Sequence, residues 1–169
     1  GIEGVHAEGG NTYGIEIYKS NNINLEGEII VRDITSERSI VGLSIVESNV
    51  NINTQKLNLY NFITIGLAPD LKAYGIDIIQ QSNVSLNSQD ITFIYNLDAK
   101  LPIGINVNNS EVTDTTAQEI IIQEIKGNQR SVGLELSNTA VYNQHEDSEY
   151  GFFEIEDRTD AAYGIYAQN

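Results

Sequence analysis

The sequence predicts an all-β fold, a right-handed parallel β-helix (β-solenoid) of about five coils with three strands per coil. One phrase, apolar-Gly-apolar-x-apolar, occurs six times. The intervals between its glycines are nearly constant, at 28, 33, 29, 29 and 31 residues. No segment combines helical periodicity with capping residues, and β-branched residues are abundant. A unit that recurs at a fixed interval is typical of a stack of coils, in which each coil contacts only its neighbours.

The repeated phrase itself is the expected first strand of each coil. Its residues alternate with period two, so we expect Tyr13, Ile15 and Ile17 to face the core while Gly14 and Glu16 face outward. The glycines would then form an outward or corner column, which either permits a tight turn or leaves a groove for a partner. The glycine column is Gly14, Gly42, Gly75, Gly104, Gly133 and Gly164. The core column that follows it is Ile15, Leu43, Ile76, Ile105, Leu134 and Ile165.

Two further short strands are expected in each coil. A polar step follows the first strand, at Ser20, Ser48, Gln81, Ser110 and Thr139. The second strand occupies residues 23–25, 50–52 and 84–86, and it weakens at 112–114 and 141–143. The third occupies residues 29–31, 57–59, 91–93, 120–122 and 152–154, and polar loops lead into the next glycine phrase.

Other repeat folds fit this pattern less well. A propeller blade needs about 40 residues in four antiparallel strands, and a leucine-rich repeat needs a Leu/Asn signature that is missing. A β-sandwich would not return one phrase at the same point of every repeat. Right-handed winding is expected because parallel β-crossovers are almost always right-handed.

Stacking would bring charged side chains of neighbouring coils together. The outward position two residues after each glycine reads Glu16, Ser44, Asp77, Asn106 and Glu135, so acids alternate with neutral residues. Like charges about 4.8 Å apart would repel, and alternation doubles that distance to about 9.6 Å. The pattern favours charge spacing for stability over a ladder of calcium ions.

Composition excludes several functions. The chain has 24 acidic and 9 basic residues, a net charge of −15, and no Cys, Met or Trp. A nucleic-acid or anionic-membrane partner needs clustered Lys and Arg, and no apolar run approaches the ~20 residues of a membrane span. Without Cys there is no disulfide, zinc–thiolate or iron–sulfur chemistry. The chain starts at Gly1 with no segment that resembles a signal peptide, so we expect a processed product or an excised piece.

The densest acidic segment lies in the last repeat, where Glu146, Asp147 and Glu149 are weak candidates for a Ca²⁺ site. Their spacing matches no defined calcium loop, and a solvated acidic loop is the simpler interpretation. No nucleophile–base set, phosphate loop or dinucleotide turn is present, so no catalytic or cofactor-binding residue is assigned. A polysaccharide-degrading β-helix would instead need a cleft with several carboxylates and a basic residue.

The chain resembles a known class of surface protein. Its coils are acidic, free of Cys and rich in Ile, Asn and Ser, and the phrase Tyr-Gly-Ile recurs at residues 13–15, 74–76 and 163–165. In these features residues 13–169 resemble the passenger regions of bacterial autotransporters and related large adhesins. The resemblance is one of style and coil length, and it transfers no functional residue. It implies secretion or display on a bacterial cell surface and adhesion to a host or neighbouring-cell protein or glycan.

Three functions therefore remain open. The first is a non-enzymatic stalk or adhesin segment, the second a carbohydrate-binding or polysaccharide-degrading β-helix, and the third a subunit that self-assembles into a filament.

The ends of the chain bear on the third function. We expect residues 4–12 to be the third strand of a preceding coil and residues 163–169 to be a first strand with nothing after it. Residues 1–169 would then be a single β-solenoid domain, a slice of a longer array, that associates end to end.

Overall fold

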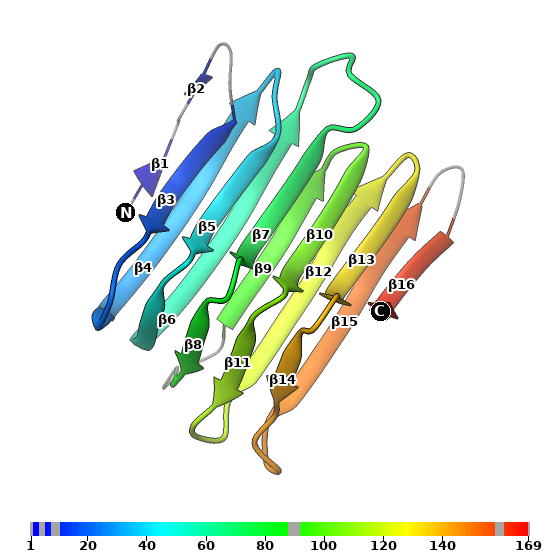
Figure 1. Cartoon of the computed structure of the whole chain (residues 1–169). Coiled ribbons are helices and arrows are strands. Elements are labelled where there is room, and N and C mark those ends of the chain that lie inside the picture. Colours follow the sequence, from blue (N-terminus) through cyan, green and yellow to red (C-terminus); the bar gives the residue numbers. More distant parts are fainter. Residues whose placement is uncertain (1, 4–5, 8–10, 88–91, 158–160, 169) are drawn as a thin grey trace.

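The computed structural model describes residues 2–3, 6–7, 11–87, 92–157 and 161–168. Throughout these residues the regular structure is β-strand, and the strands pair in parallel to form stacked coils, which confirms the predicted β-solenoid (Figure 1). No helix that could cross a bilayer occurs in this part of the chain.

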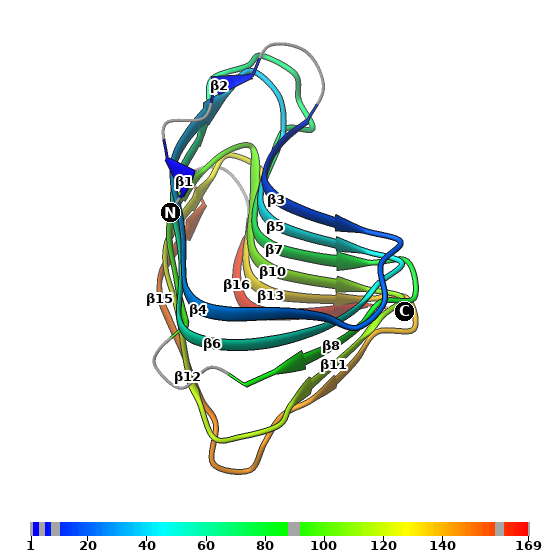
Figure 2. The same ribbon diagram turned by 90° about the vertical axis from the view of Figure 1, so that its left-hand side faces the viewer.

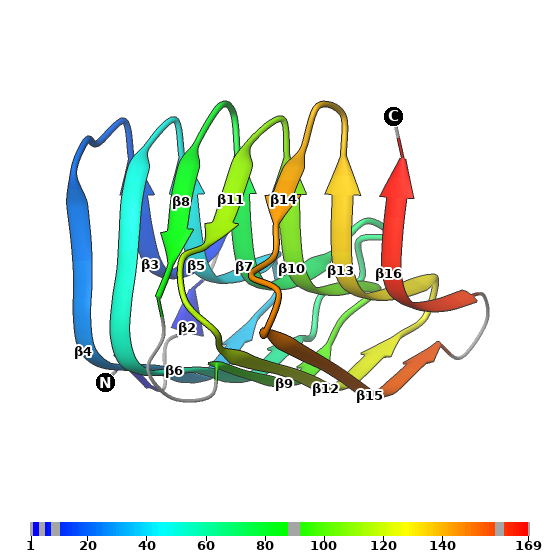
Figure 3. The ribbon, with the colours of Figure 1, turned by 90° about the horizontal axis from the view of Figure 1, so that it is seen from below.

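Two parallel sheets form the walls of the stack (Figure 3). The six-stranded sheet holds the glycine phrases in chain order: β3 (Thr12–Tyr18), β5 (Ile40–Val46), β7 (Lys72–Ile79), β10 (Leu101–Asn108), β13 (Arg130–Ser137) and β16 (Ala161–Gln168). The ten-stranded sheet contains β4 (Ile23–Ser36), β6 (Asn49–Thr64), β8 (Asn83–Leu86), β9 (Thr92–Asp98), β11 (Glu111–Asp114), β12 (Glu119–Gly127), β14 (Val141–Asn143) and β15 (Glu149–Asp157), with β1 (Ile2–Glu3) and β2 (His6–Ala7) beside β4.

The second and third strands are continuous in the first two coils. They run together as β4 and β6, with a register shift between Gly27 and Glu28, and separate into two strands in the later coils. The predicted third strand was misplaced twice. Leu57 pairs with Thr92 and Ile120 with Tyr150, so the matching segments are residues 92–94 and 150–152 rather than 91–93 and 152–154. Ile91 lies outside the described residues.

The column after each glycine is a core ladder, as predicted. Leu43 pairs with Ile76, which pairs with Ile105, and their side chains are 0%, 1% and 1% exposed. The ladder opens toward both ends of the stack, since Ile15 is partly buried and Ile165 is 58% exposed.

The predicted orientation of the glycines is wrong. A Cβ on Gly75 would lie 2.5 Å from both the carbonyl oxygen of Gly104 and Cγ2 of Ile94, a side chain of the core. Gly75 and Ile76 therefore both face inward, and strict alternation fails at this point. The glycine is needed because the two sheets approach each other closely here. An outward glycine groove for a partner is ruled out by the same geometry.

The residue before each glycine consequently faces away from the main core. Val41, Tyr74, Ile103 and Val132 form a second apolar cluster, with Tyr166 packed against it. They are buried in this second cluster rather than in the main core, where they were expected. Viewed along the stack, the chain turns as it enters the six-stranded sheet, which contains these residues (Figure 2).

A column of left-handed residues that the sequence analysis did not identify bends the third strand. Its members are Asp33, Asn61, Asn96, Glu124 and Glu154, with φ between 51° and 59°. Asn tolerates this conformation better than most residues. Asn61 donates from Nδ2 to Oδ1 of Asp33 (2.7 Å), and Asn96 donates to Oδ1 of Asn61 (2.8 Å). These bonds tie successive coils together.

A serine ladder occupies the corner after the first strand. The backbone N–H of Ser48 donates to Oγ of Ser82 (3.1 Å), and that of Ser82 donates to Oγ of Ser110 (3.1 Å). The predicted polar step was right at Ser48 and Ser110 but fell one residue early at Gln81. The cause is an extra residue in the third coil, where Gln80 and Gln81 both have positive φ.

The start of the chain runs beside the third strand, as expected. Strand β1 pairs with Val31 and Arg32, and β2 pairs with Thr35 and Ser36. Residues 4–5 and 8–10 of this expected strand lie outside the described part.

Candidate binding surface

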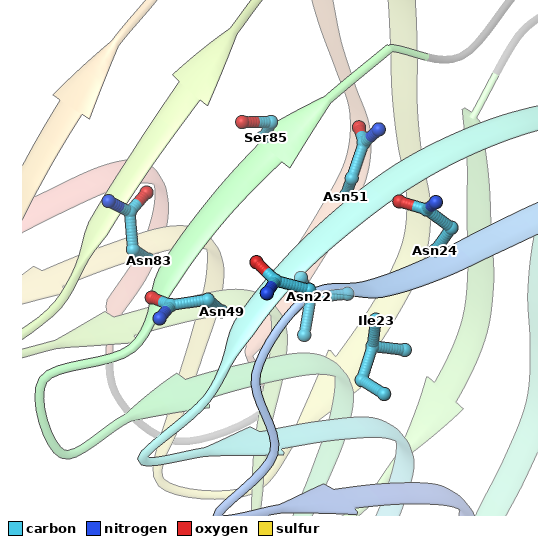
Figure 4. A pocket seen from close by; sticks show the side chains of 8 residues that line it. Asn22, Ile23, Asn24, Asn49, Asn51, Asn83 and Ser85 are labelled. Carbon is cyan, nitrogen blue, oxygen red and sulfur yellow. The ribbon is translucent and has the colours of Figure 1, made fainter.

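An open hollow lies on the outer face of the second strands, over the beginnings of β4 and β6 and over β8 (Figure 4). Its volume is about 420 Å³. We call it the asparagine hollow, because amide side chains dominate its lining. It is lined by Asn22, Ile23, Asn24, Asn49, Val50, Asn51, Asn83 and Ser85.

Strand alternation creates this surface. Val50 and Val84 point into the core and are 4% and 0% exposed, so the residues on either side of them point outward. Register then aligns the outward residues of successive coils. Asn24 pairs with Asn51 and Asn51 with Ser85, while Asn49 pairs with Asn83. Equivalent polar groups therefore recur along the stack at the strand spacing of about 4.8 Å.

Most of these polar side chains have no hydrogen-bond partner within the described part of the chain. Asn49 donates from Nδ2 to Oδ1 of Asn21 (2.9 Å). By contrast, five other lining side chains make no hydrogen bond to any described residue: Asn22, Asn24, Asn51, Asn83 and Ser85. Each amide offers two donors and an acceptor, and each hydroxyl offers one donor and two lone pairs. The surface therefore presents a dense set of free donors and acceptors.

The lining contains no charged side chain, although the chain carries a net charge of −15. Amides and hydroxyls do not exchange protons near neutral pH, so these residues supply no general acid or base. The arrangement is suited to holding a polar molecule rather than to transforming it.

The polar surface continues into later coils. A second hollow of about 390 Å³ shares Asn49 and Asn83 with the first and extends to Asn109 and Thr139. Here the side chains bond to one another, since the hydroxyl of Thr139 donates to Oδ1 of Asn109. Glu111 also lines it, so the second hollow is neither free of charge nor free of internal bonds.

The calcium candidates are not gathered into a site. Glu146, Asp147 and Glu149 are exposed, and no group of three or more His, Asp or Glu side chains suitable for a metal occurs among the described residues. Asp147 instead interacts with its own loop. Its backbone N–H donates to Nδ1 of His145 (3.2 Å).

Two of the three alternating acids of the six-stranded sheet, Asp77 and Glu135, are held by neighbours, while Glu16 is exposed as expected. Asn106 donates from Nδ2 to Oδ1 of Asp77 (2.7 Å), and Arg130 lies 2.8 Å from Oε1 of Glu135. Asp77 and Glu135 are only 9% and 6% exposed, although they were expected on an open outer face. Burial raises the pKa of Asp77, opposed by the Asn106 hydrogen bond. Burial also raises the pKa of the neighbouring Tyr74 phenol.

A buried polar cluster in the last coils was also missed. Asp114 is 5% exposed and aligns with Leu86 of the preceding coil, so it occupies a core position. Tyr142 and Tyr150 surround it, and burial raises the pKa of both phenols. The sequence did carry a signal for this cluster, because Asp114 occupies a column in which Leu86 and Ile52 are aliphatic.

The chain was compared with protein-family models, with curated protein sequences and with solved structures, and none of them gave a match.

Proposed function

We propose that the chain is a non-enzymatic segment of a secreted or bacterial cell-surface β-solenoid, which serves as a stalk and an adhesin. The observation that carries this proposal is the asparagine hollow, a set of unpartnered amides and a hydroxyl on the outside of a stack of coils. Continuous core ladders make such a stack stiff, and a stiff rod can hold a binding surface away from a cell.

The charged side chains support binding rather than catalysis. The buried acids Asp77 and Glu135 are each held by a neighbour, Asn106 and Arg130 respectively. The composition and the Tyr-Gly-Ile phrases add the resemblance to bacterial adhesin passengers. The partners we propose are a protein or glycan of a host or neighbouring cell, with no cofactor.

One observation favours a polysaccharide-degrading alternative. Asp77 aligns with Asn106 and Asn106 with Glu135, so the two acids stand two coils apart. That places them about 9.6 Å apart in the backbone, near the upper limit of carboxyl separations in inverting glycosidases. Because both acids are buried and bonded to neighbours, we favour a structural role for them.

Glycan-array binding combined with turnover assays separates these functions. The isolated chain is applied to an array of neutral and acidic glycans, and the same polysaccharides are incubated with it and assayed for new reducing ends. We expect binding without cleavage. Reproducible cleavage that is lost in Asp77→Asn, or on substitution of Glu146, Asp147 or Glu149, would overturn the non-enzymatic proposal.

A further inference from the structure

We propose that the asparagine hollow is a binding site for an uncharged saccharide, an inference that rests on the proposed adhesive function. It names both the ligand class and the residues that hold the ligand.

The hydrogen-bonding capacity of the hollow matches hydroxyl groups. A sugar hydroxyl both donates and accepts, so it is best met by groups that do both within one side chain. The amides of Asn24, Asn51 and Asn83 do so, and no described residue occupies them. A carboxylate would only accept and an ammonium would only donate, and neither is present in the lining.

Charge selects against anionic ligands. With a net charge of −15 on the chain and no basic side chain in the lining, a uronate, sialylated or phosphorylated sugar meets repulsion that nothing local offsets. A cation would find stronger ligands in the carboxylates found elsewhere on the surface. An uncharged polyhydroxyl molecule avoids both problems.

The shape of the hollow suits a short oligosaccharide. Its volume of about 420 Å³ falls within the usual range for small-ligand sites. Equivalent polar groups recur over three successive coils, so a ligand with repeating hydroxyls can lie along the stack. Ile23 borders the hollow but packs against the core, so the groups that the hollow offers to a ligand are the polar side chains.

The test uses uncharged cello-, manno- and malto-oligosaccharides, with trigalacturonate as the anionic counterpart. Side-chain amide signals of the intact chain are followed by NMR during titration. An open polar site implies weak binding, so the titration extends to about 50 mM, well above a millimolar dissociation constant. We expect shifts in the lining asparagines with at least one uncharged probe and none with trigalacturonate.

Substitutions then test the residues. Asn51→Ala and Asn83→Ala should each weaken binding roughly three- to tenfold, since each removes hydrogen bonds to the ligand. The matched control is Asn143→Ala, because Asn143 ends the same column but lies outside the hollow and bonds to Glu111 and Thr113. It should bind like the unaltered chain. Circular dichroism confirms that all three variants are folded.

Several outcomes would contradict the inference. Unchanged binding in Asn51→Ala and Asn83→Ala, preference for trigalacturonate, or no amide shift with any uncharged probe would each overturn it. If shifts appear only at residues outside the hollow, this site assignment fails while the proposed adhesive function stands. Cleavage of a probe would overturn the proposed function instead.

Discussion

The hydroxyl of Tyr150 donates a 2.6 Å hydrogen bond to Oδ2 of Asp114, a carboxyl that stands in a core column. The aligned residues in the two preceding coils are Leu86 and Ile52. The phenol oxygens of Tyr150 and Tyr142 lie 2.7 Å apart, so the acid and the two phenols form one network. Hydrogen bonding lets this column accept a polar residue that would otherwise be costly to bury.

We expect this network to make the stability of the protein depend on pH. Burial raises the pKa of Asp114, although the Tyr150 hydrogen bond opposes the shift. A raised pKa means that the folded state binds this proton more tightly than the unfolded chain does. Stability should therefore increase as the pH falls from neutral through the raised pKa, and level off below the ordinary Asp value of about 3.9. Asp77, also shifted upward, acts in the same direction.

We expect Asp114→Asn to flatten this dependence, because Asn can still accept from Tyr150 but does not titrate. The control is Asp147→Asn, which removes the same charge from a side chain that is 74% exposed. The measurement is the melting temperature by circular dichroism between about pH 8 and pH 4, the range above the ordinary Asp pKa. Equal slopes for Asp114→Asn and the unaltered chain would contradict the assignment.

Gly75→Ala should destabilise the protein by about 1–3 kcal/mol or more, because the new Cβ would clash with a backbone oxygen and with Ile94. Gly164 offers a control in the same column. Its Cβ would lie 3.5 Å from the nearest atoms of Phe152, an ordinary contact, so Gly164→Ala should change stability by about 0.5 kcal/mol or less. Urea unfolding followed by tyrosine fluorescence measures both. Equal tolerance would mean that the glycines face outward after all.

The repeat was sufficient to predict the fold, because a stack of coils carries the same sequence signal in every coil. The ladder of Leu43, Ile76 and Ile105 could be read from spacing alone. The side that each glycine faces could not be predicted from spacing, because strict alternation of side chains assumes a straight strand. Here Gly75 and Ile76 both face the core. Close approach of two sheets is a tertiary property, and a glycine can signal either a turn or such an approach.

The asparagine hollow could have been predicted in part. Asparagines alternate with Ile23, Val50 and Val84 in the second strands, which is sufficient to place them outward. What the sequence does not show is which amides are already bonded. Asn49 bonds to Asn21 while Asn51 has no described partner, and that difference depends on side-chain positions. The free amides that define the candidate site therefore emerge only from the structure.

Ile76→Asp should destabilise the protein by several kcal/mol, because it places an unpaired charge in a ladder position that is 1% exposed. Leu67→Asp is the control, since it adds the same charge at a side chain that is 97% exposed. Thermal unfolding at neutral pH compares the two. An unchanged melting temperature for Ile76→Asp would show that the column assignment is wrong.

The isolated 169-residue chain should associate end to end as salt increases. Strand β16 pairs with β13 on one side, and no described strand pairs with its other edge, which can template further pairing. Ile165 and Phe153 are 58% and 53% exposed in these last coils. The net charge of −15 opposes association, and salt shortens the range of that repulsion from about 30 Å at 0.01 M to about 3 Å at 1 M.

Ile165→Lys separates strand pairing from simple charge repulsion. Lysine at an exposed edge blocks pairing, yet the substitution also reduces the net negative charge. If repulsion alone sets the assembly state, this variant should associate more readily than the unaltered chain. If strand pairing at the edge of β16 is the contact, Ile165→Lys should associate less readily than the unaltered chain. Multi-angle light scattering at low and high salt decides between them, and a strictly monomeric unaltered chain at every salt and concentration would contradict end-to-end association altogether.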